Sequence, residues 1–209
     1  MPIFRRRPDP PSHSDYRRYK QVLREDFNNR CAYCLLHEGD EMGGGFQNFH
    51  IDHFRPRKKF LDLISTYANL YYACRWCNGA KGETWPSTEE EQLGFGFVDP
   101  CVEDLYTTHA KLDPGTGKLE PRSKPGKYTI REIRLNREKF KELRKQRIDA
   151  QDMIQNTQAR ISRLDAEQHP KIELISELKD KLARLEKYIN PKIPYESADL
   201  LVITRIESN

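Results

Sequence analysis

The chain has 209 residues, enough for one catalytic domain with an appendage and for a buried core of its own. Only 36% of the residues are hydrophobic, 33% are charged, and the mean hydropathy is −0.88, which together predict a small core that carries long, solvated helices. The net charge of +4 excludes a surface that binds polyanions all over, so any contact with nucleic acid must be a local patch.

Residues 1–14 form a basic, proline-rich segment that starts Met1-Pro2-Ile3-Phe4-Arg5-Arg6-Arg7-Pro8. No apolar run follows the arginines, and no stretch approaches the ~20 apolar residues that cross a membrane. We therefore expect a cytoplasmic protein. The segment is expected to be an arm without a core of its own, ahead of a domain at residues 15–126.

The predicted elements of that domain begin with a helix, because Tyr16, Tyr19, Leu23 and Phe27 have the spacing of one helical face. A glycine-rich loop at residues 39–45 then precedes a strand expected at 46–52. A second strand is expected at 70–73, and a short helix from near Arg75 to Gly82. The order strand, loop, strand, helix places several polar side chains around one site.

Four of the five cysteines form two Cys-x-x-Cys pairs, Cys31 with Cys34 and Cys74 with Cys77. Four thiolates are the soft ligand set that selects zinc, and paired Cys-x-x-Cys knuckles are its usual sequence form. The gap between the two pairs is longer than in a simple zinc ribbon, which predicts a functional insert.

The insert and the residues just after it carry a second group of polar side chains. Its elements are His50-Ile51-Asp52-His53 with Pro56, then Asn69, then Asn78 and Lys81-Gly82. In a strand, His50 would share the face of Asp52, as a further metal ligand or as a structural histidine. A cluster of basic residues is predicted to bind DNA phosphates: Arg55, Arg57, Lys58, Lys59 and, one helical turn beyond Asn78, Lys81.

Together these elements resemble the HNH endonucleases, a family with the ββα-metal fold, over about a quarter of the chain. The resemblance implies an α+β protein whose ββα-metal core is stapled by a zinc site of four cysteines. It also implies the catalytic residues: His53 as the general base, Asn69 as the residue that orients it, and Asp52 and Asn78 as holders of a divalent cation. Carboxylate and amide oxygens are hard ligands that suit Mg²⁺ or Mn²⁺.

Residues 83–126 contain five prolines and are expected to wrap irregularly around the core, with short β-like runs at 95–98 and 105–106. Within them, Asp113-Pro114-Gly115-Thr116-Gly117 predicts a turn between two short strands.

Residues 127–209 are expected to form a helical hairpin and a C-terminal tail. Helical spacing from Thr129 onward predicts one long helix, stopped by Pro170, which is placed to begin the next helix at its first turn. The two apolar stripes, which predict an antiparallel pair, are Phe140, Leu143, Ala150, Ile154, Ile161 and Leu164 in the first helix, and Ile172, Ile175, Leu178, Leu182, Leu185 and Ile189 in the second.

The arginine-rich start and the segment Ile130–Asn136 extend the resemblance to HNH effectors of bacterial anti-phage systems such as Septu and some retrons. That resemblance implies a role in defence and an ATPase partner bound through residues 129–190; assembly with a second copy is the alternative. The competing hypothesis is a non-catalytic zinc adaptor that tethers a partner complex to nucleic acid. The His-x-Asp-His insert favours the nuclease, because a purely structural zinc module does not require it.

Overall fold

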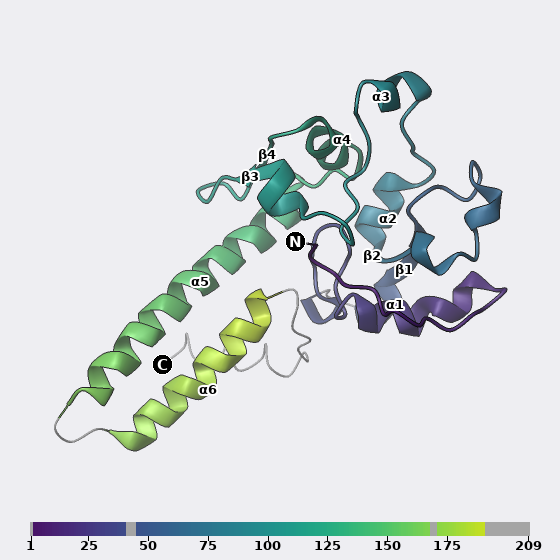
Figure 1. Cartoon of the computed structure of the whole chain (residues 1–209). Helices are drawn as coiled ribbons and strands as arrows, with labels where there is room; N and C mark the ends of the chain where they lie inside the picture. Colours follow the sequence, from purple (N-terminus) through teal and green to yellow (C-terminus); the bar gives the residue numbers. More distant parts are fainter. Residues whose placement is uncertain (1, 41–44, 168–170, 191–209) are drawn as a thin grey trace. The chain divides into compact units, whose positions relative to one another are not determined.

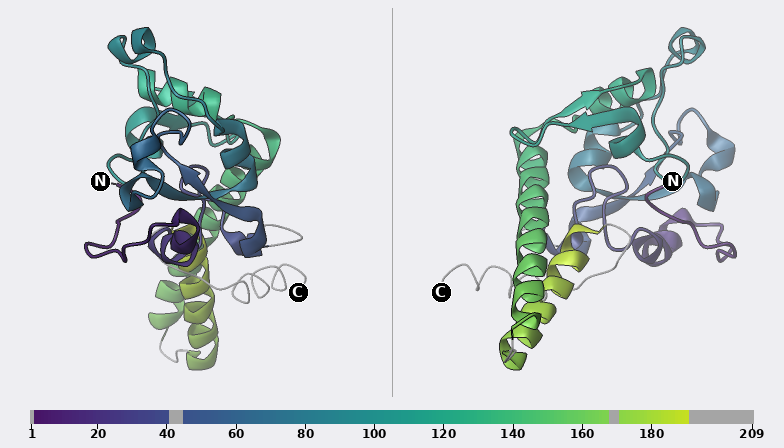
Figure 2. Two further views of the ribbon diagram at one scale, coloured as in Figure 1. Left: turned by 90° about the vertical axis from the view of Figure 1, so that its right-hand side faces the viewer. Right: turned by 60° about the vertical axis from the view of Figure 1, so that its left-hand side comes forward.

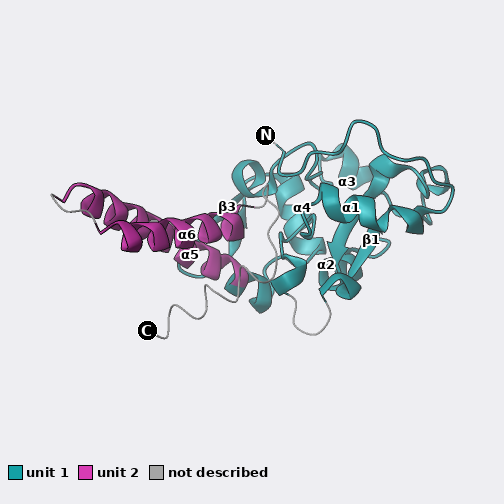
Figure 3. Cartoon of the chain, turned by 90° about the horizontal axis from the view of Figure 1, so that it is seen from below, with its two compact units in different colours: residues 1–142 teal, residues 143–209 magenta. Residues whose placement is uncertain are grey.

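The computed structural model describes residues 2–40, 45–167 and 171–190 (Figure 1). Contacts divide the chain into two compact units, Met1–Glu142 and Leu143–Asn209, so the boundary falls within one long helix (Figure 3). The domain boundaries expected after residues 14 and 126 stay predictions. The fold class is α+β, as the sequence predicts.

The centre of the first unit is an antiparallel hairpin of β1 (Phe49–His53) and β2 (Leu70–Cys74), followed at once by α2 (Arg75–Lys81). Its register pairs Phe49 with Cys74 and His53 with Leu70. Helix α1 (Lys20–Asp26) also packs on the hairpin, as the views in Figure 2 show. This is the predicted ββα arrangement, although β1 starts at Phe49 because residues 45–48 form a 3-10 turn.

Strand β2 is buried along its whole length, as expected for the continuous apolar run Leu-Tyr-Tyr-Ala-Cys. The ring of Tyr72 stacks on Phe49 across the hairpin with centroids 4.9 Å apart, and Tyr71 stacks on Phe54 at 5.1 Å. Aromatic pairs of this kind add to the stabilisation from buried area. They hold the end of β1 in a fixed place, and that end carries the polar residues of the insert.

The N-terminal segment packs into this unit, in contrast to the expected arm. Phe4 is 1% exposed, and its amide donates to the carbonyl of Pro100 at 3.3 Å. The Arg6 guanidinium lies 4.4 Å from the Tyr71 ring centroid and donates to the carbonyls of Tyr67 and Leu70. Phe4 and Arg6 therefore anchor this segment to the unit, which its basic, proline-rich composition does not predict.

The region after α2 was expected to be irregular, but it contains a helix, a turn and two short strands. The turn expected at residues 113–117 is confirmed, since it joins β3 (Ala110–Leu112) to β4 (Leu119–Pro121). The β-like runs expected at 95–98 and 105–106 are wrong. Residues Leu105–His109 form a π-helical turn, whose first amides at Tyr106 and Thr107 are capped by the Asp104 carboxylate. Helix α3 (Thr88–Gln92) was not anticipated, although Ser87 and Glu90 make a capping box.

The long helix expected from Thr129 is two helices, α4 (Lys124–Glu132) and α5 (Glu138–Asp165). Arg134 breaks the helix with a φ of +55°; its amide donates to the Arg131 carbonyl and the Leu135 amide donates to the Ile130 carbonyl. These two bonds define a Schellman motif, in which the left-handed position is usually glycine.

The second unit contains the predicted antiparallel helical pair, α5 with α6 (Ile172–Ile189). Most of the predicted stripe residues pack there, in two clusters along the pair. One cluster contains Ala150, Ile154, Leu182, Leu185 and Ile189 together with Tyr188, which was not predicted, and the other contains Ile161, Leu164, Ile175 and Leu178. Ile172 is an exception, because it is 77% exposed. Pro170 lies outside the described residues. In the part of the chain that is described, no helix is both long and apolar enough to cross a membrane.

Candidate functional site

The four knuckle cysteines converge on one buried point. Cys31 and Cys34 lie in the turn after α1, Cys74 ends β2, and Cys77 lies in α2. All four sulfurs lie within 4.8 Å of one another, and the Cys34 and Cys74 sulfurs are 3.7 Å apart. A tetrahedral zinc ion with Zn–S bonds of about 2.3 Å sets neighbouring sulfurs about 3.8 Å apart. The cluster is therefore compatible with a structural zinc ion.

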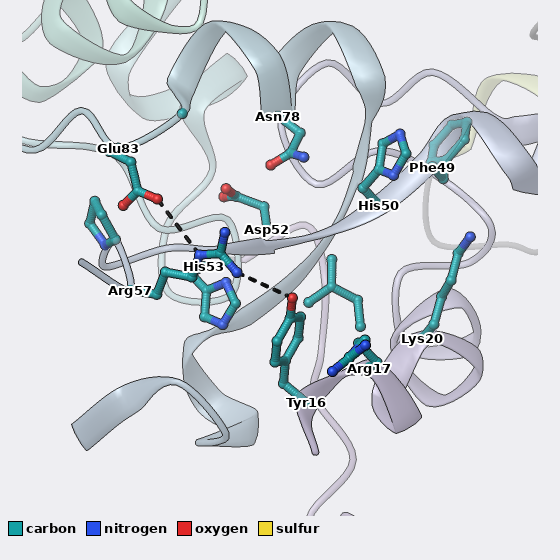
Figure 4. Close-up of a pocket in the computed structure, with 13 residues that line it drawn as sticks. Tyr16, Arg17, Lys20, Phe49, His50, Asp52, His53, Arg57, Asn78 and Glu83 are labelled. Atoms are coloured by element: carbon teal, nitrogen blue, oxygen red, sulfur yellow. Dashed lines mark hydrogen bonds and ion pairs between the residues drawn. The ribbon is translucent and has the colours of Figure 1, made fainter. Parts of the chain in front are cut away.

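A separate pocket of about 440 Å³ lies over the end of β1 and is shown in Figure 4. Asp52 and Asn78 point toward each other in that view, while His53 lies beside Tyr16 and Arg57. The pocket is lined by Tyr16, Arg17, Lys20, Phe49, His50, Ile51, Asp52, His53, Pro56, Arg57, Asn78, Gly82 and Glu83. The hard-ligand residues thus gather away from the cysteine sulfurs, although α2 contributes to both places.

The His53 ring is held in one tautomer. Its Nε2 lies 2.9 Å from the Ile64 carbonyl oxygen, which can only accept a hydrogen bond, so Nε2 carries the proton and donates it. Nδ1 is then the nitrogen with a free lone pair. Burial lowers the pKa of His53, the charges of Arg57 and Lys81 lower it further, and the Ile64 hydrogen bond opposes them. A neutral imidazole with one oriented acceptor can take a proton from a bound water.

Asn69 fastens the loop that supplies the Ile64 carbonyl. Its Oδ1 accepts from the Arg55 amide at 2.8 Å, and its Nδ2 donates to the carbonyls of Arg55 at 3.0 Å and Leu63 at 3.3 Å. Because these bonds join the residues just after His53 to the residue before Ile64, they fix the loop around the imidazole. These contacts fit the orienting role expected of Asn69.

Asp52 is 2% exposed and is surrounded by donors. Lys81 Nζ lies 3.3 Å from Oδ1 and 3.2 Å from Oδ2, and the Tyr33 hydroxyl donates to Oδ2. Burial raises the pKa of Asp52 to about 6, although Lys81 and Tyr33 counteract it. A carboxylate offers about four lone-pair positions, so these contacts leave room for a metal bond.

Two more predicted residues share the pocket with Asp52. Asn78 is half-buried and presents its side-chain amide on the first turn of α2. His50 is exposed on β1, and its pKa is lowered by burial and by the charge of Lys20. A carboxylate and an amide oxygen in one polar pocket are a fitting donor set for Mg²⁺ or Mn²⁺.

The predicted phosphate-binding residues are dispersed. Arg57 lines the pocket, and its guanidinium is 3.8 Å from Glu83. Arg55 instead lies over the rings of Phe60 and Trp85. Lys58 and Lys59 are exposed and do not line the pocket. Lys81 is fully buried and also donates to the His53 carbonyl at 2.6 Å, so its position does not fit the phosphate contact expected of it.

Sequence reasoning missed the wall of the pocket that the 3-10 turn η1 (Tyr16–Tyr19) and the start of α1 provide. The Tyr16 ring packs edge-on against the His53 ring with centroids 4.8 Å apart, and its hydroxyl accepts from Arg57 at 3.4 Å. Arg17 and Lys20 also face the pocket. The helical spacing identified the element, but no local signal indicates that it lies against residues nearly 40 positions later.

Comparison with known proteins agrees with this geometry. Residues 31–84 match the family model described as HNH endonuclease, so the chain contains an HNH endonuclease domain. The match begins at the first knuckle and ends just after α2.

The chain is also distantly related to the Septu protein PtuB of Bacillus thuringiensis, with 30% identity over 117 residues. That alignment covers 56% of this chain and 40% of the relative, so the chain spans well under half of the length of the curated relative it matches. No solved structure matches.

Proposed function

We propose that this protein is a metal-dependent endonuclease that hydrolyses phosphodiester bonds of DNA. The observation that carries the proposal is the His53 imidazole, whose Nε2 donates to the Ile64 carbonyl, in a pocket shared with Asp52 and Asn78. A non-catalytic zinc knuckle has no need for a histidine held in one tautomer beside a pair of hard oxygen donors.

In this mechanism His53 Nδ1 accepts a proton from the water that attacks the phosphorus atom. Asn69 and the Ile64 carbonyl keep the ring in place, so the base is oriented before the substrate arrives. Asp52 and Asn78 would hold a divalent cation, which supplies positive charge for the phosphate and the leaving oxygen. Arg57 is placed to bind a phosphate oxygen at the rim of the pocket.

The cysteines have a structural role in this proposal. A zinc ion held by Cys31, Cys34, Cys74 and Cys77 would tie the turn after α1 to β2 and α2. Such a site has four protein ligands and no open position, which is typical of zinc that stabilises a fold. The reaction therefore takes place in the separate pocket.

Plasmid nicking by the purified protein with Mg²⁺ or Mn²⁺ tests the proposal. His53→Ala is expected to abolish strand cleavage while zinc content and thermal stability stay unchanged, because the cysteines are untouched. His13→Ala is the matched control, since His13 does not line the pocket. Undiminished nicking by the His53→Ala protein would remove His53 from the mechanism.

The metal assignment has its own test. Asp52→Ala and Asn78→Ala are expected to lose metal-dependent nicking and to keep their zinc. If zinc were bound through His50, Asp52 and Asn78 instead, elemental analysis of a variant without the four cysteines would still find one equivalent of zinc. The division into two metal sites would then be wrong.

A role in bacterial anti-phage defence follows from the similarity to the Septu protein PtuB. We propose that residues 129–190 join the nuclease to an ATPase partner, with a second copy of the chain as the alternative. Assembly is the function proposed for the α5–α6 pair because every proposed site residue lies before Glu83, and nothing in the pair resembles a nuclease site.

One observation favours the competing function, a non-catalytic zinc adaptor that tethers a partner complex to nucleic acid. Asp52 already receives hydrogen bonds from Lys81 and Tyr33, as a purely structural buried carboxylate would. The nicking experiment separates the two, because an adaptor binds DNA and leaves it intact with every metal tested.

A further inference from the structure

The pocket carries positive side chains at both of its ends. In Figure 4, Arg57 lies near Glu83 at one end, whereas Arg17 and Lys20 lie toward the other, with Asp52 and Asn78 between them. Arg57 belongs to the segment that matches the HNH family model, but Arg17 and Lys20 precede that segment. Their contribution to the pocket is specific to the way in which the N-terminal helix packs on this domain.

Lys20 is a cation held in place without an acidic partner. Its Nζ donates to the Phe46 carbonyl at 3.1 Å and lies 3.9 Å from the centroid of the Phe46 ring. Among the described residues, no carboxylate lies within ion-pair distance of it. Partial burial lowers the pKa of Lys20, although the charge of Glu38 opposes this shift, so an approaching anion would restore interactions that the ammonium has lost with water.

Arg17 can exchange its present partner for a phosphate. Its guanidinium is 3.2 Å from Asp15, and the two side chains are 78% and 46% exposed. An exposed pair of this kind contributes little to stability, because water and salt screen it. Asp15 is fixed by another bond, since it caps the turn by accepting from the Arg17 amide. Breaking the side-chain pair therefore leaves the element in place.

We infer that Arg17 and Lys20 form a second phosphate-binding site, so that the DNA backbone runs along the pocket from Arg57 to Lys20. This inference rests on the proposed function, which places the cleaved bond between the Arg57 end and the Lys20 end of the pocket. A strand of DNA is a row of single negative charges, and cations at two ends of one pocket match the sign of such a row. Phosphate contacts of this kind set the register of the strand without reading its sequence.

Binding measured without cleavage tests the site. The full chain with His53→Ala is titrated with a fluorescent DNA duplex of arbitrary sequence over a series of NaCl concentrations. The slope of log K against log[NaCl] is negative, and adding Arg17→Gln and Lys20→Gln is expected to reduce its magnitude by about 1.8, because each lost phosphate contact removes about 0.9. The matched control, Arg18→Gln with Lys127→Gln, removes the same charge from exposed residues that do not line the pocket.

An unchanged slope in the Arg17→Gln, Lys20→Gln protein, or an equal decrease of its magnitude in the control, would overturn the inference. Zinc content and thermal unfolding of each variant establish that the fold is kept. Because binding is measured in a background that cannot cleave, the result is independent of the nicking experiment. If the unmodified chain never nicks DNA but the magnitude of the slope decreases as expected, the proposed function fails and the phosphate site stands.

Discussion

At the scale of single residues, Tyr16 is the neighbour of His53 that the sequence motif does not contain. The imidazole donates to the Ile64 carbonyl, and the Tyr16 ring packs on it from η1. The loop that contains Ile64 is also joined to the residues just before η1, since the Ser65 hydroxyl donates to the Ser14 carbonyl at 2.6 Å. Tyr16 is therefore a positioning residue for the proposed base.

Tyr16→Ala is expected to lower kcat for DNA cleavage by about 10- to 100-fold with little change in KM, because a loosened ring spends less time in the reactive geometry. Tyr16→Phe keeps the ring and is expected to stay within about threefold of the native rate. Single-turnover kinetics on a duplex substrate measure both variants. Equal losses in the two, or a loss confined to KM, would show that Tyr16 acts through its hydroxyl or through DNA binding instead.

Lys81 gives a second prediction at this scale, because it is the buried counter-charge of Asp52. Lys81→Met is expected to lower the free energy of unfolding by about 3 kcal/mol, since it leaves a carboxylate in the interior without its cation. Lys59→Met, at an exposed position, is expected to change it by less than about 0.5 kcal/mol. Denaturant titration measures both.

A double variant completes that test. Asp52→Asn removes the charge that Lys81 neutralises, so Lys81→Met together with Asp52→Asn should recover part of the lost stability. Additive losses in the double variant would mean that the two side chains do not interact. The ion pair would then have no part in holding the end of β1.

Local motifs were enough to predict the chemical groups of this site but not their surroundings. The resemblance to the HNH endonucleases names His53, Asp52 and Asn78, and all three line one pocket. Lys81, one helical turn beyond Asn78, was expected to contact a phosphate, yet it is buried against Asp52. A helical period gives the face on which a residue lies, whereas burial of a charge depends on which partner the rest of the fold places there.

At the scale of elements, the proposed zinc site would join the turn after α1 to β2 and α2, and its loss should release all three. Cys31→Ser is expected to lose the metal and to melt far below the native protein, because structural zinc contributes on the order of 10 kcal/mol to the folding of small modules. Cys101→Ser is the matched control, as Cys101 lies outside the cluster. A Cys31→Ser protein with one equivalent of zinc and the native Tm would contradict a zinc site built from the four cysteines.

The break between α4 and α5 shows why element boundaries were harder to predict than elements. The sequence from Thr129 to Asn136 has no glycine or proline, so its pattern predicts an unbroken helix. The observed Schellman turn has Arg134 in the left-handed position, which costs an L-residue about 1 kcal/mol. Its flanking residues Ile133 and Leu135 are fully buried, and their burial offsets that cost. Long-range packing decided the boundary.

At the scale of the whole molecule, the proposed site residues all belong to one of the two compact units. Every residue proposed for zinc, cation, base and phosphate lies in the unit Met1–Glu142. That unit extends through α4, where Tyr128, Ile130 and Ile133 are buried, and the Thr129 hydroxyl accepts from the Val98 amide at 2.8 Å. A cut after residue 126 would remove part of the core of the nuclease unit. The division at 142 is the better guide for experiment.

A chain that ends at Glu142 is therefore expected to keep its zinc and its nicking activity and to lose its assembly partner. A two-helix pair offers the roughly 20–30 residues per side that a standard interface needs, and its polar outer faces leave room for another chain after α5 and α6 have covered each other. Light scattering measures the mass of both chain lengths, and co-purification with a candidate ATPase tests the partner. If the shortened chain kept the native mass and partner but bound DNA more weakly, the α5–α6 pair would be a DNA clamp. Its many lysine and arginine side chains would then bind the DNA phosphates.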